Sequence, residues 1–155
     1  MTAEYGADEA RAEAVRALEA EFSELMARAR RVMIDNAERV SPGMLPAAYK
    51  ILSTIARCEQ VTASALAERM LLDKSQISRA VRELEELGFV ERTPDPNDRR
   101  SALLRLTPLG AERLAAAREP QEGLLLHTLR DWPVGDIENL SRLLHALTSG
   151  VRPAT

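Results

Sequence analysis

The segment 62–110 constrains the fold more than any other part of this 155-residue chain. Apolar residues follow helical spacing over two short stretches, 63–70 and 74–87, and residues 89–93 and 101–106 then read as two strands. A polar, turn-forming loop with the sequence PDPNDRR joins the two strands. The segment is therefore predicted to form two short helices followed by a β-hairpin.

Residues at the boundaries of these elements are of the types that begin and end helices. Asp73 and Gln76 give the D-x-x-Q form of a capping box at the start of the second helix. Gly88 suits the left-handed conformation that ends a helix, and Thr107-Pro108 restarts one with an N-cap and an early proline. This order of elements is the layout of a winged helix-turn-helix, which places its second helix in the major groove of DNA.

A long helix is predicted ahead of this segment, over residues 8–39, and a shorter one over 46–57. A helix of this length spans about 48 Å, more than a chain of this size needs for itself. We therefore expect part of its apolar seam to meet a second copy of the chain, the alternative being that the seam packs within one chain. The seam consists of Val15, Leu18, Phe22, Leu25, Ala29 and Val32.

Two further helical patterns follow the hairpin. The first runs from 107 to about 129 and should be kinked at Pro120 and Gly123, and the second covers 134–149. With only 3 % aromatic residues, the fold class is predicted to be mainly α with a small β-hairpin wing. We expect a single domain, residues 1–155, with a DNA-binding lobe at 45–106 and N- and C-terminal dimerisation helices at 8–39 and 107–149.

Composition and motif searches narrow the functional classes. No stretch has the length of apolar sequence that a membrane span needs, no secretory signal is recognisable at the start, and the lone Cys58 suits the cytosol. His127 and His145 lack metal-ligand spacing, so no metal and no cofactor are expected. No nucleophile–base pattern and no phosphate-binding loop are present, so we expect the protein not to be an enzyme.

The second short helix carries the chemistry of a DNA-reading element. Although the net charge is −3, one face of this helix is predicted to be apolar and the opposite face short-chained and then cationic. Gln pairs with adenine and Arg pairs bidentately with guanine, whereas a lysine at the helix start suits a phosphate. The predicted DNA-binding side chains here are Lys74, Ser75, Gln76, Ser78, Arg79 and Arg82.

The hairpin loop supplies a second predicted contact. Arg99 and Arg100 lie where the loop should project, and a slim cationic tip suits the minor groove. Asp95 and Asp98 are expected to cap the turn and hold one arginine by ion pairing. One arginine then reaches DNA; we favour Arg99, and which of the two does so stays open.

The stretch LAERM-LLDKSQISRAVRELEELGFVERTPDPNDRRSALLRLTPLG closely resembles the multiple-antibiotic-resistance regulator (MarR) family. The particular matches are DKSQISR, LEELGFVER, DPNDRR and LTPLG. The resemblance implies a homodimer that binds a pseudo-palindromic double-stranded DNA operator in the cytoplasm. It also implies a repressor that releases DNA when a small, often phenolic, effector or an oxidant acts.

By position, the resemblance puts Ser75, Gln76, Ser78, Arg79 and Arg82 on the recognition helix, Arg99 and Arg100 on the wing, and Asp98 at the wing aspartate. Two departures stand out. Many relatives have Gly where Leu71 stands, and we expect the turn here to avoid positive φ. Oxidant-sensing relatives carry their cysteine in the first helix, so this role does not transfer to Cys58.

An effector pocket follows from the resemblance alone, and the residues offer three weak candidates: Tyr49, Met26 and Met33. Residues of these types at such positions are more often part of the core than ligand contacts. The predicted function is a sequence-specific, ligand-responsive transcriptional regulator. The alternatives are a dimeric winged-helix module that binds another protein without specific DNA binding, and an architectural DNA-binding protein without ligand control.

Overall fold

The computed structural model describes the backbone of residues 2–96, 98 and 101–152, and the side chains from residue 8 onward within those ranges. The chain forms two compact units, Met1–Ala117 and Arg118–Thr155, which we describe separately. The predicted organisation as one domain with dimerisation helices at both ends stays a prediction.

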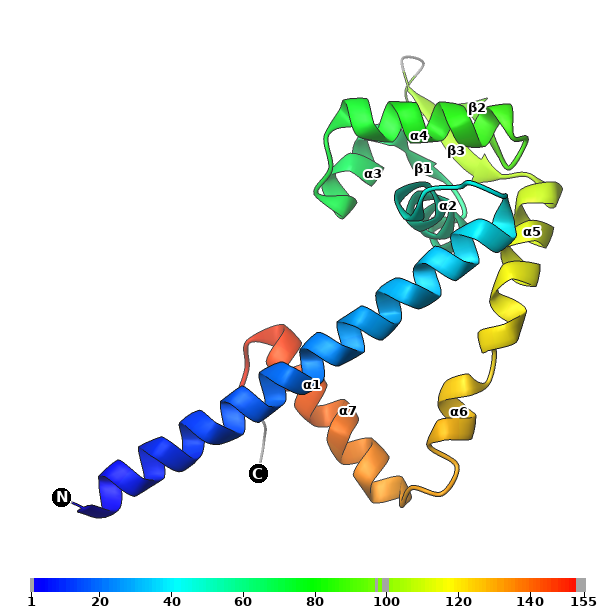
Figure 1. The fold of residues 1–155 in the computed structure, drawn as a ribbon. Coiled ribbons are helices and arrows are strands. Elements are labelled where there is room, and N and C mark those ends of the chain that lie inside the picture. The colour runs from blue at the N-terminus through cyan, green and yellow to red at the C-terminus, as the bar shows by residue number, and fades with distance from the viewer. Residues whose placement is uncertain (1, 97, 99–100, 153–155) are drawn as a thin grey trace. The chain divides into compact units, whose positions relative to one another are not determined.

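The first unit holds five helices and three strands in its described residues (Figure 1). In chain order they are α1 (Thr2–Val40), α2 (Pro46–Cys58), β1 (Val61–Thr62), α3 (Ala63–Met70), α4 (Lys74–Glu86), β2 (Val90–Pro94), β3 (Ala102–Leu106) and α5 (Pro108–Arg118). The predicted fold class, mainly α with a small hairpin wing, is confirmed.

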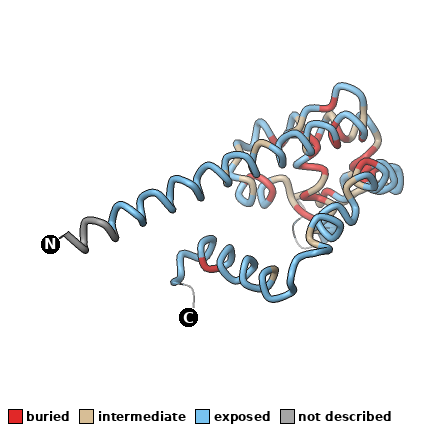
Figure 2. The backbone as a smooth tube through the Cα atoms, turned by 60° about the horizontal axis from the view of Figure 1, so that its bottom comes forward, coloured by how far each residue is buried: buried red, intermediate tan, exposed pale blue. Residues whose placement is uncertain are grey.

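Burial in this unit is concentrated at one end, around α2 (Figure 2). Ile51, Leu52 and Ile55 of α2 are at most 1 % exposed, and they pack with α3, α4 and β3 into one apolar core. Only the C-terminal end of α1 enters that core, through Ala37 and Val40. The core therefore fixes α3, α4 and the hairpin as one rigid lobe.

The sheet has three antiparallel strands in the order β1-β3-β2. Val61 pairs with Leu104, and Arg92 pairs with the same residue from the other side. The link between α2 and α3 is thus partly a strand, and it pairs with the hairpin through β3.

Local signals placed the start and the end of α4 and the start of α5 correctly, whereas α1 begins at Thr2 rather than at the predicted residue 8. The Asp73–Gln76 capping box starts α4, and Gly88 has a φ of +74° just beyond its end. The Thr107 hydroxyl donates to the Gly88 carbonyl oxygen at 2.6 Å and accepts from the Gly110 N–H at 3.0 Å. Thr107 is therefore the cap of α5 and also a tie to the turn after α4.

The turn between α3 and α4 contradicts one expectation. Leu71 does adopt the left-handed conformation, with φ +53° and ψ +43°, although a side chain there is disfavoured. The reason is a helix-ending motif in which the Leu71 N–H bonds to Glu68 and the Leu72 N–H bonds to Ala67 at 3.0 Å. The packing of α3 against α4 fixes this motif, whatever residue occupies the turn.

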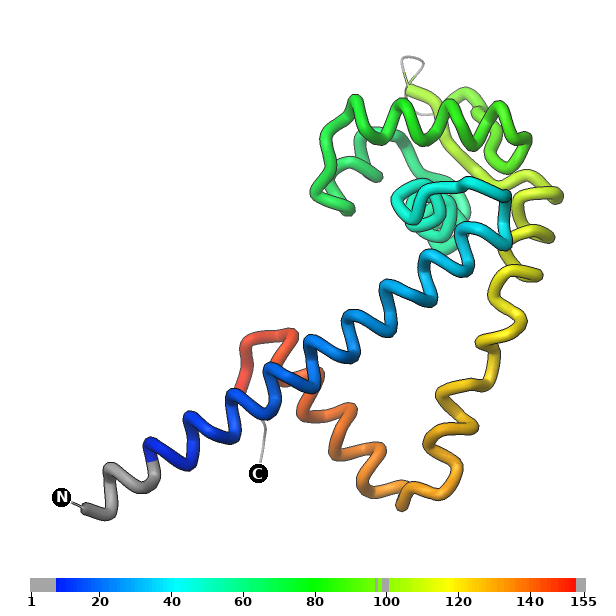
Figure 3. Tube along the Cα trace, in the orientation of Figure 1, coloured from blue at the N-terminus to red at the C-terminus, as the bar shows by residue number. Residues whose placement is uncertain are grey.

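The second unit contains a 3₁₀ turn (Glu119–Gln121), α6 (Leu124–Thr128) and α7 (Val134–Ser149), whose path can be followed in Figure 3. The prediction of one kinked helix from 107 to 129 is wrong, because α5 ends at Arg118. Pro120 lies in the 3₁₀ turn and Gly123 takes a φ of +79°, so together they break the helix. The last helix has the bounds predicted for it.

Two stretches of helix leave apolar side chains uncovered. On α1, Val15, Leu18 and Leu25 are each about half exposed. In the second unit, Leu125 and Leu126 of α6 are more than 70 % exposed. Four leucines of α7 are also exposed to a smaller extent: Leu140, Leu143, Leu144 and Leu147. None of the helices in the described part of the chain combines the length and apolarity that a membrane crossing needs.

Candidate nucleic-acid interface

The helix α4 has the two faces that the sequence predicted. Ile77, Val81 and Leu84 are completely buried against the core, whereas the polar side chains of the opposite face are exposed. The exposed set consists of Lys74, Ser75, Gln76, Ser78, Arg79 and Arg82. The lobe thus presents one continuous polar helix face to a partner.

Gln76 has a structural role in addition to its predicted role as a DNA contact. Its side-chain oxygen accepts the backbone N–H of Asp73 at 3.2 Å, which completes the capping box. A glutamine that pairs bidentately with adenine needs both its oxygen and its NH₂ group. While the box is intact, only the NH₂ group of Gln76 is available to a base.

The two arginines of the exposed face differ in what holds them. Arg79 donates from Nε to the Ser75 carbonyl oxygen at 3.3 Å. Arg82 makes an ion pair with Glu86, one turn later, at 3.2 Å, and both side chains are more than two-thirds exposed. Among the described residues, no carboxylate pairs with Lys74 or Arg79, so these two carry the unbalanced positive charge of the face.

At the base of the wing, each of two arginines forms an ion pair with a glutamate, so their charges cancel. Arg92 of β2 pairs with Glu85 of α4 at 2.8 Å, and Arg105 of β3 pairs with Glu91 of β2. Neither ion pair was predicted from the sequence. The Arg105–Glu91 pair follows from cross-strand register, which is known only once the strands are aligned.

The tip of the wing is described in part. The Asp95 N–H bonds to the Ser101 carbonyl oxygen at 3.2 Å, and the Ser101 N–H bonds to the Asp98 carbonyl oxygen at 2.9 Å. The backbones of both aspartates therefore close the loop; the predicted roles of their side chains stay predictions. Arg99 and Arg100 lie outside the described residues.

The structure does not bring the three candidate effector residues together at a pocket. Tyr49 is 8 % exposed, and its hydroxyl accepts from the side-chain amide of the buried Asn36 at 3.1 Å, which joins α2 to α1. Met33 packs against the core, whereas Met26 is 61 % exposed. Their predicted role as ligand contacts stays a prediction.

A groove lies beside the exposed polar face of α4, between this helix and the start of α2. Its volume is about 310 Å³, and its lining includes Leu45, Leu72, Gln76, Arg79 and Glu83. Two side chains of the exposed polar face, Gln76 and Arg79, thus form part of its wall. A molecule in this groove would compete with DNA for them.

No group of three or more His, Cys, Asp or Glu side chains within the described residues is arranged to hold a metal ion. Cys58 is a free, partly exposed thiol whose sulfur lies 3.6 Å from an Arg69 nitrogen.

Comparisons with known proteins find relatives that share part of this sequence. A model of the MarR family matches residues 43–101. A protein of Thauera aromatica, named as a transcriptional regulatory protein for the hcr operon, is 41 % identical over 82 residues, which is 53 % of this chain and 47 % of that protein. The chain spans about half the length of the first curated relatives it matches.

Solved structures extend the likeness beyond the lobe. A mutant MarR from E. coli complexed with operator DNA is 25 % identical with a TM-score of 0.59, covering 82 % of this chain and 93 % of that one. FabT of Streptococcus pneumoniae in complex with DNA shares the fold, with a TM-score of 0.70 at 17 % identity, over 85 % of this chain and 95 % of its own.

The lobe and its exposed helix face define a winged helix-turn-helix protein. Within that class, the chain is similar to proteins of the MarR family, whose model matches residues 43–101. The relatives reported above are regulators or DNA-binding proteins by name, not enzymes, in agreement with the expectation from the sequence.

Proposed function

We propose that this protein is a sequence-specific DNA-binding transcriptional regulator that acts in the cytoplasm as a homodimer, with the recognition helix α4 in the major groove. The observation that carries the proposal is the exposed face of α4, on which Lys74 and Arg79 are cations without a carboxylate partner among the described residues. Short serine side chains beside them let the backbone approach base edges. Relatives with the same fold bind DNA in their solved structures.

Within this proposal, each predicted contact has a part. Gln76, Ser78 and Arg82 read base edges with Arg79 and Ser75, and Lys74 holds a phosphate. Arg99 or Arg100 enters the flanking minor groove, with Asp95 and Asp98 shaping the loop. Arg82 must exchange Glu86 for DNA, which costs little because both groups are exposed.

Dimerisation is supported by the uncovered apolar side chains of α1. A soluble protein seldom exposes a row of leucines and valines that serves no contact. Two copies would place two recognition helices one turn of DNA apart, so the operator should be an imperfect palindrome. Repression rather than activation is proposed from the resemblance alone.

A small, often aromatic effector is also part of the proposal. The groove beside Gln76 and Arg79 supports it, because a bound molecule there would block the same side chains that read DNA. A change of DNA affinity on addition of a phenolic compound would support ligand control. Unchanged DNA affinity with a compound demonstrably bound would favour the architectural alternative.

The test is fluorescence anisotropy of the full chain with DNA from upstream of its own gene and with scrambled DNA of equal length. We expect at least about a hundredfold preference for the first and two protomers per site. With about three to four phosphates neutralised per protomer, log K should fall against log salt with a slope of about −5 to −7. Equal or absent binding to both DNAs would overturn the proposal and favour a protein-interaction module.

A further inference from the structure

A second pocket lies within the first compact unit, and none of the proposed DNA-contacting residues lines it. It has a volume of about 480 Å³, which is in the range of small-molecule sites. Its lining comes from the end of α2, the turn after it, the base of the hairpin and the start of α5. Three segments that are separate in sequence, 55–60, residue 91 and 105–111, therefore converge on one pocket.

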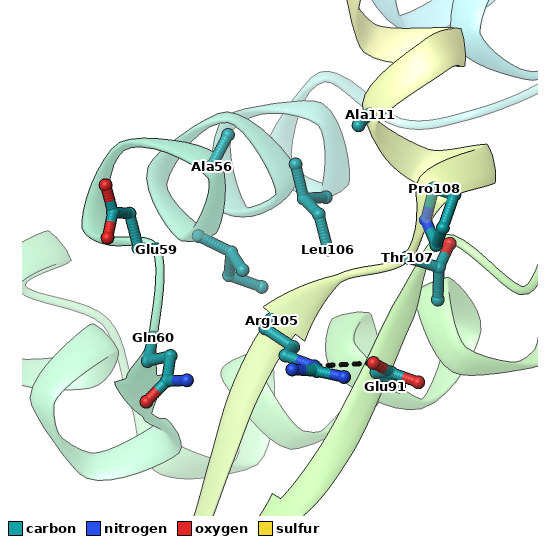
Figure 4. A pocket seen from close by; sticks show the side chains of 10 residues that line it. Ala56, Glu59, Gln60, Glu91, Arg105, Leu106, Thr107, Pro108 and Ala111 are labelled. Atoms are coloured by element: carbon teal, nitrogen blue, oxygen red, sulfur yellow. Dashed lines mark hydrogen bonds and ion pairs between the residues drawn. The ribbon is translucent and has the colours of Figure 1, made fainter.

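The pocket has an apolar side. Ile55, which is fully buried, lines the pocket together with Ala56, Leu106 and Ala111, the last three labelled in Figure 4. Pro108 adds a rigid apolar ring at the first position of α5. This side offers contact area to a hydrocarbon or aromatic body, with burial worth about 25 cal/mol for each Å².

The charged side of the pocket is net negative. Arg105 and Glu91 neutralise each other through their ion pair, drawn as a dashed line in Figure 4. Glu59 also lines the pocket, and its carboxylate has no hydrogen-bond or ion-pair partner among the described residues. One unbalanced carboxylate beside an apolar wall favours a cation and disfavours an anion.

The backbone that presents Glu59 is strained. Glu59 has a φ of +59° and a ψ of −52°, and the Gln60 N–H bonds to the Cys58 carbonyl oxygen at 2.6 Å. This is a γ-turn of the rare kind with positive φ. Strained residues of this kind cluster at ligand-binding sites, and here the strain falls on the residue with the unpaired carboxylate.

We propose that this pocket binds a small organic cation with an apolar body, an alkyl- or arylalkyl-ammonium, whose nitrogen pairs with Glu59. The binding event itself does not depend on DNA. Its regulatory consequence rests on the proposed function, because the pocket is lined by β3, which leads back from the wing, and by the start of α5.

Isothermal titration calorimetry of the full chain, without DNA, tests the proposal with three probes of one shape. These are 4-phenylbutylammonium, 4-phenylbutan-1-ol and 4-phenylbutyrate. We expect the ammonium to bind at least about fivefold more tightly than the alcohol, and the carboxylate to bind most weakly. Equal affinities for all three, or no binding of the ammonium, would overturn the proposal.

Variants locate the site. Glu59→Gln should remove the preference for the ammonium over the alcohol, whereas Glu112→Gln, on the exposed surface of α5 outside the pocket lining, should leave it unchanged. Ala111→Phe should fill the pocket and weaken both probes by at least about tenfold, with circular dichroism confirming the fold. An ammonium preference that survives Glu59→Gln would place the site elsewhere. DNA binding without ligand is measured separately, so failure here is distinct from failure of the proposed function.

Discussion

At the scale of single residues, Leu71 is in a conformation that suits glycine and is 92 % exposed. Its side chain therefore contributes almost no packing, while the left-handed backbone costs about 1 kcal/mol or more. Leu71→Gly should raise the free energy of unfolding by about 1 kcal/mol, measured by urea denaturation.

Leu71→Ala is the matched control for this prediction, because alanine keeps the Cβ atom that makes the conformation unfavourable. It should leave stability within about 0.5 kcal/mol of the unsubstituted chain. Equal stabilisation by glycine and alanine would show that removal of an exposed leucine, not the backbone, is responsible.

Gln76 combines a structural and a predicted reading role, and one substitution separates them. Gln76→Glu keeps the oxygen that accepts the Asp73 N–H but removes the NH₂ donor and adds negative charge. Stability should stay the same or rise slightly, because a carboxylate is favourable near a helix N-terminus. Affinity for the preferred DNA should fall by tenfold or more, measured by anisotropy.

Gln121→Glu makes the same chemical change in the 3₁₀ turn after α5 and should affect neither quantity by a comparable amount. If Gln76→Glu lost stability as well as DNA affinity, the reading role could not be separated from the cap. Unchanged DNA affinity would remove Gln76 from the proposed contacts.

At the scale of elements, α5 approaches the backbone of Phe89, just before β2, so closely that only glycine fits at position 110. A Cβ atom on Gly110 would lie 2.1 Å from the Phe89 carbonyl oxygen, a backbone atom that cannot rotate away. Gly110→Ala should therefore destabilise the fold by about 1–3 kcal/mol or more, observed as a lower thermal midpoint.

Gly135→Ala is the control for that prediction, because an added Cβ there meets nothing within 4 Å. Gly135 lies in α7, where alanine is the better helix former, so stability should stay equal or rise. A Gly110→Ala variant as stable as Gly135→Ala would mean that α5 moves aside without cost.

Most element boundaries could be predicted from the sequence because the residues that set them act locally. The Asp73 cap, the Gly88 turn and the Thr107 cap each require a particular side chain within a few positions. The left-handed conformation of Leu71 was not predicted, although many relatives have Gly there, because a leucine side chain disfavours it. Pro120 marked an interruption, but the sequence did not distinguish a kink from the break that Pro120 and Gly123 make together.

The exposed face of α4 could be predicted from the sequence, but the ion pairs beside it were not predicted. The face follows from the helical repeat, and the structure places all six predicted side chains of α4 on its exposed side. The partners of Arg92 and Arg105 depend on how α4, β2 and β3 align in space. Spacing alone could have found the Arg82–Glu86 pair, since i,i+4 residues are neighbours on a helix.

At the scale of the whole molecule, the apolar seam of α1 predicts the oligomeric state. Leu18→Glu combined with Leu25→Glu puts two charges on side chains that are about half exposed in one chain. If the seam is the dimer interface, burying these charges is costly, and sedimentation velocity should show a monomer where the unsubstituted chain is a dimer.

Ala20→Glu is the control, because residue 20 faces away from the seam by helical spacing. This variant should stay dimeric and keep its DNA affinity. A double seam variant that remains dimeric would assign the interface to other surfaces, such as the exposed leucines of the second unit.

The hydroxyl of Thr107 links three parts of the lobe through two hydrogen bonds. The hydroxyl donates to the carbonyl oxygen of Gly88, just beyond the end of α4. The same oxygen accepts the Gly110 N–H in the first turn of α5. A tilt of α5 about its first turn must therefore either carry the end of α4 with it or break a bond of 2.6 Å. The angle at which α4 meets a groove is thus coupled, through one side chain, to the direction in which α5 leaves.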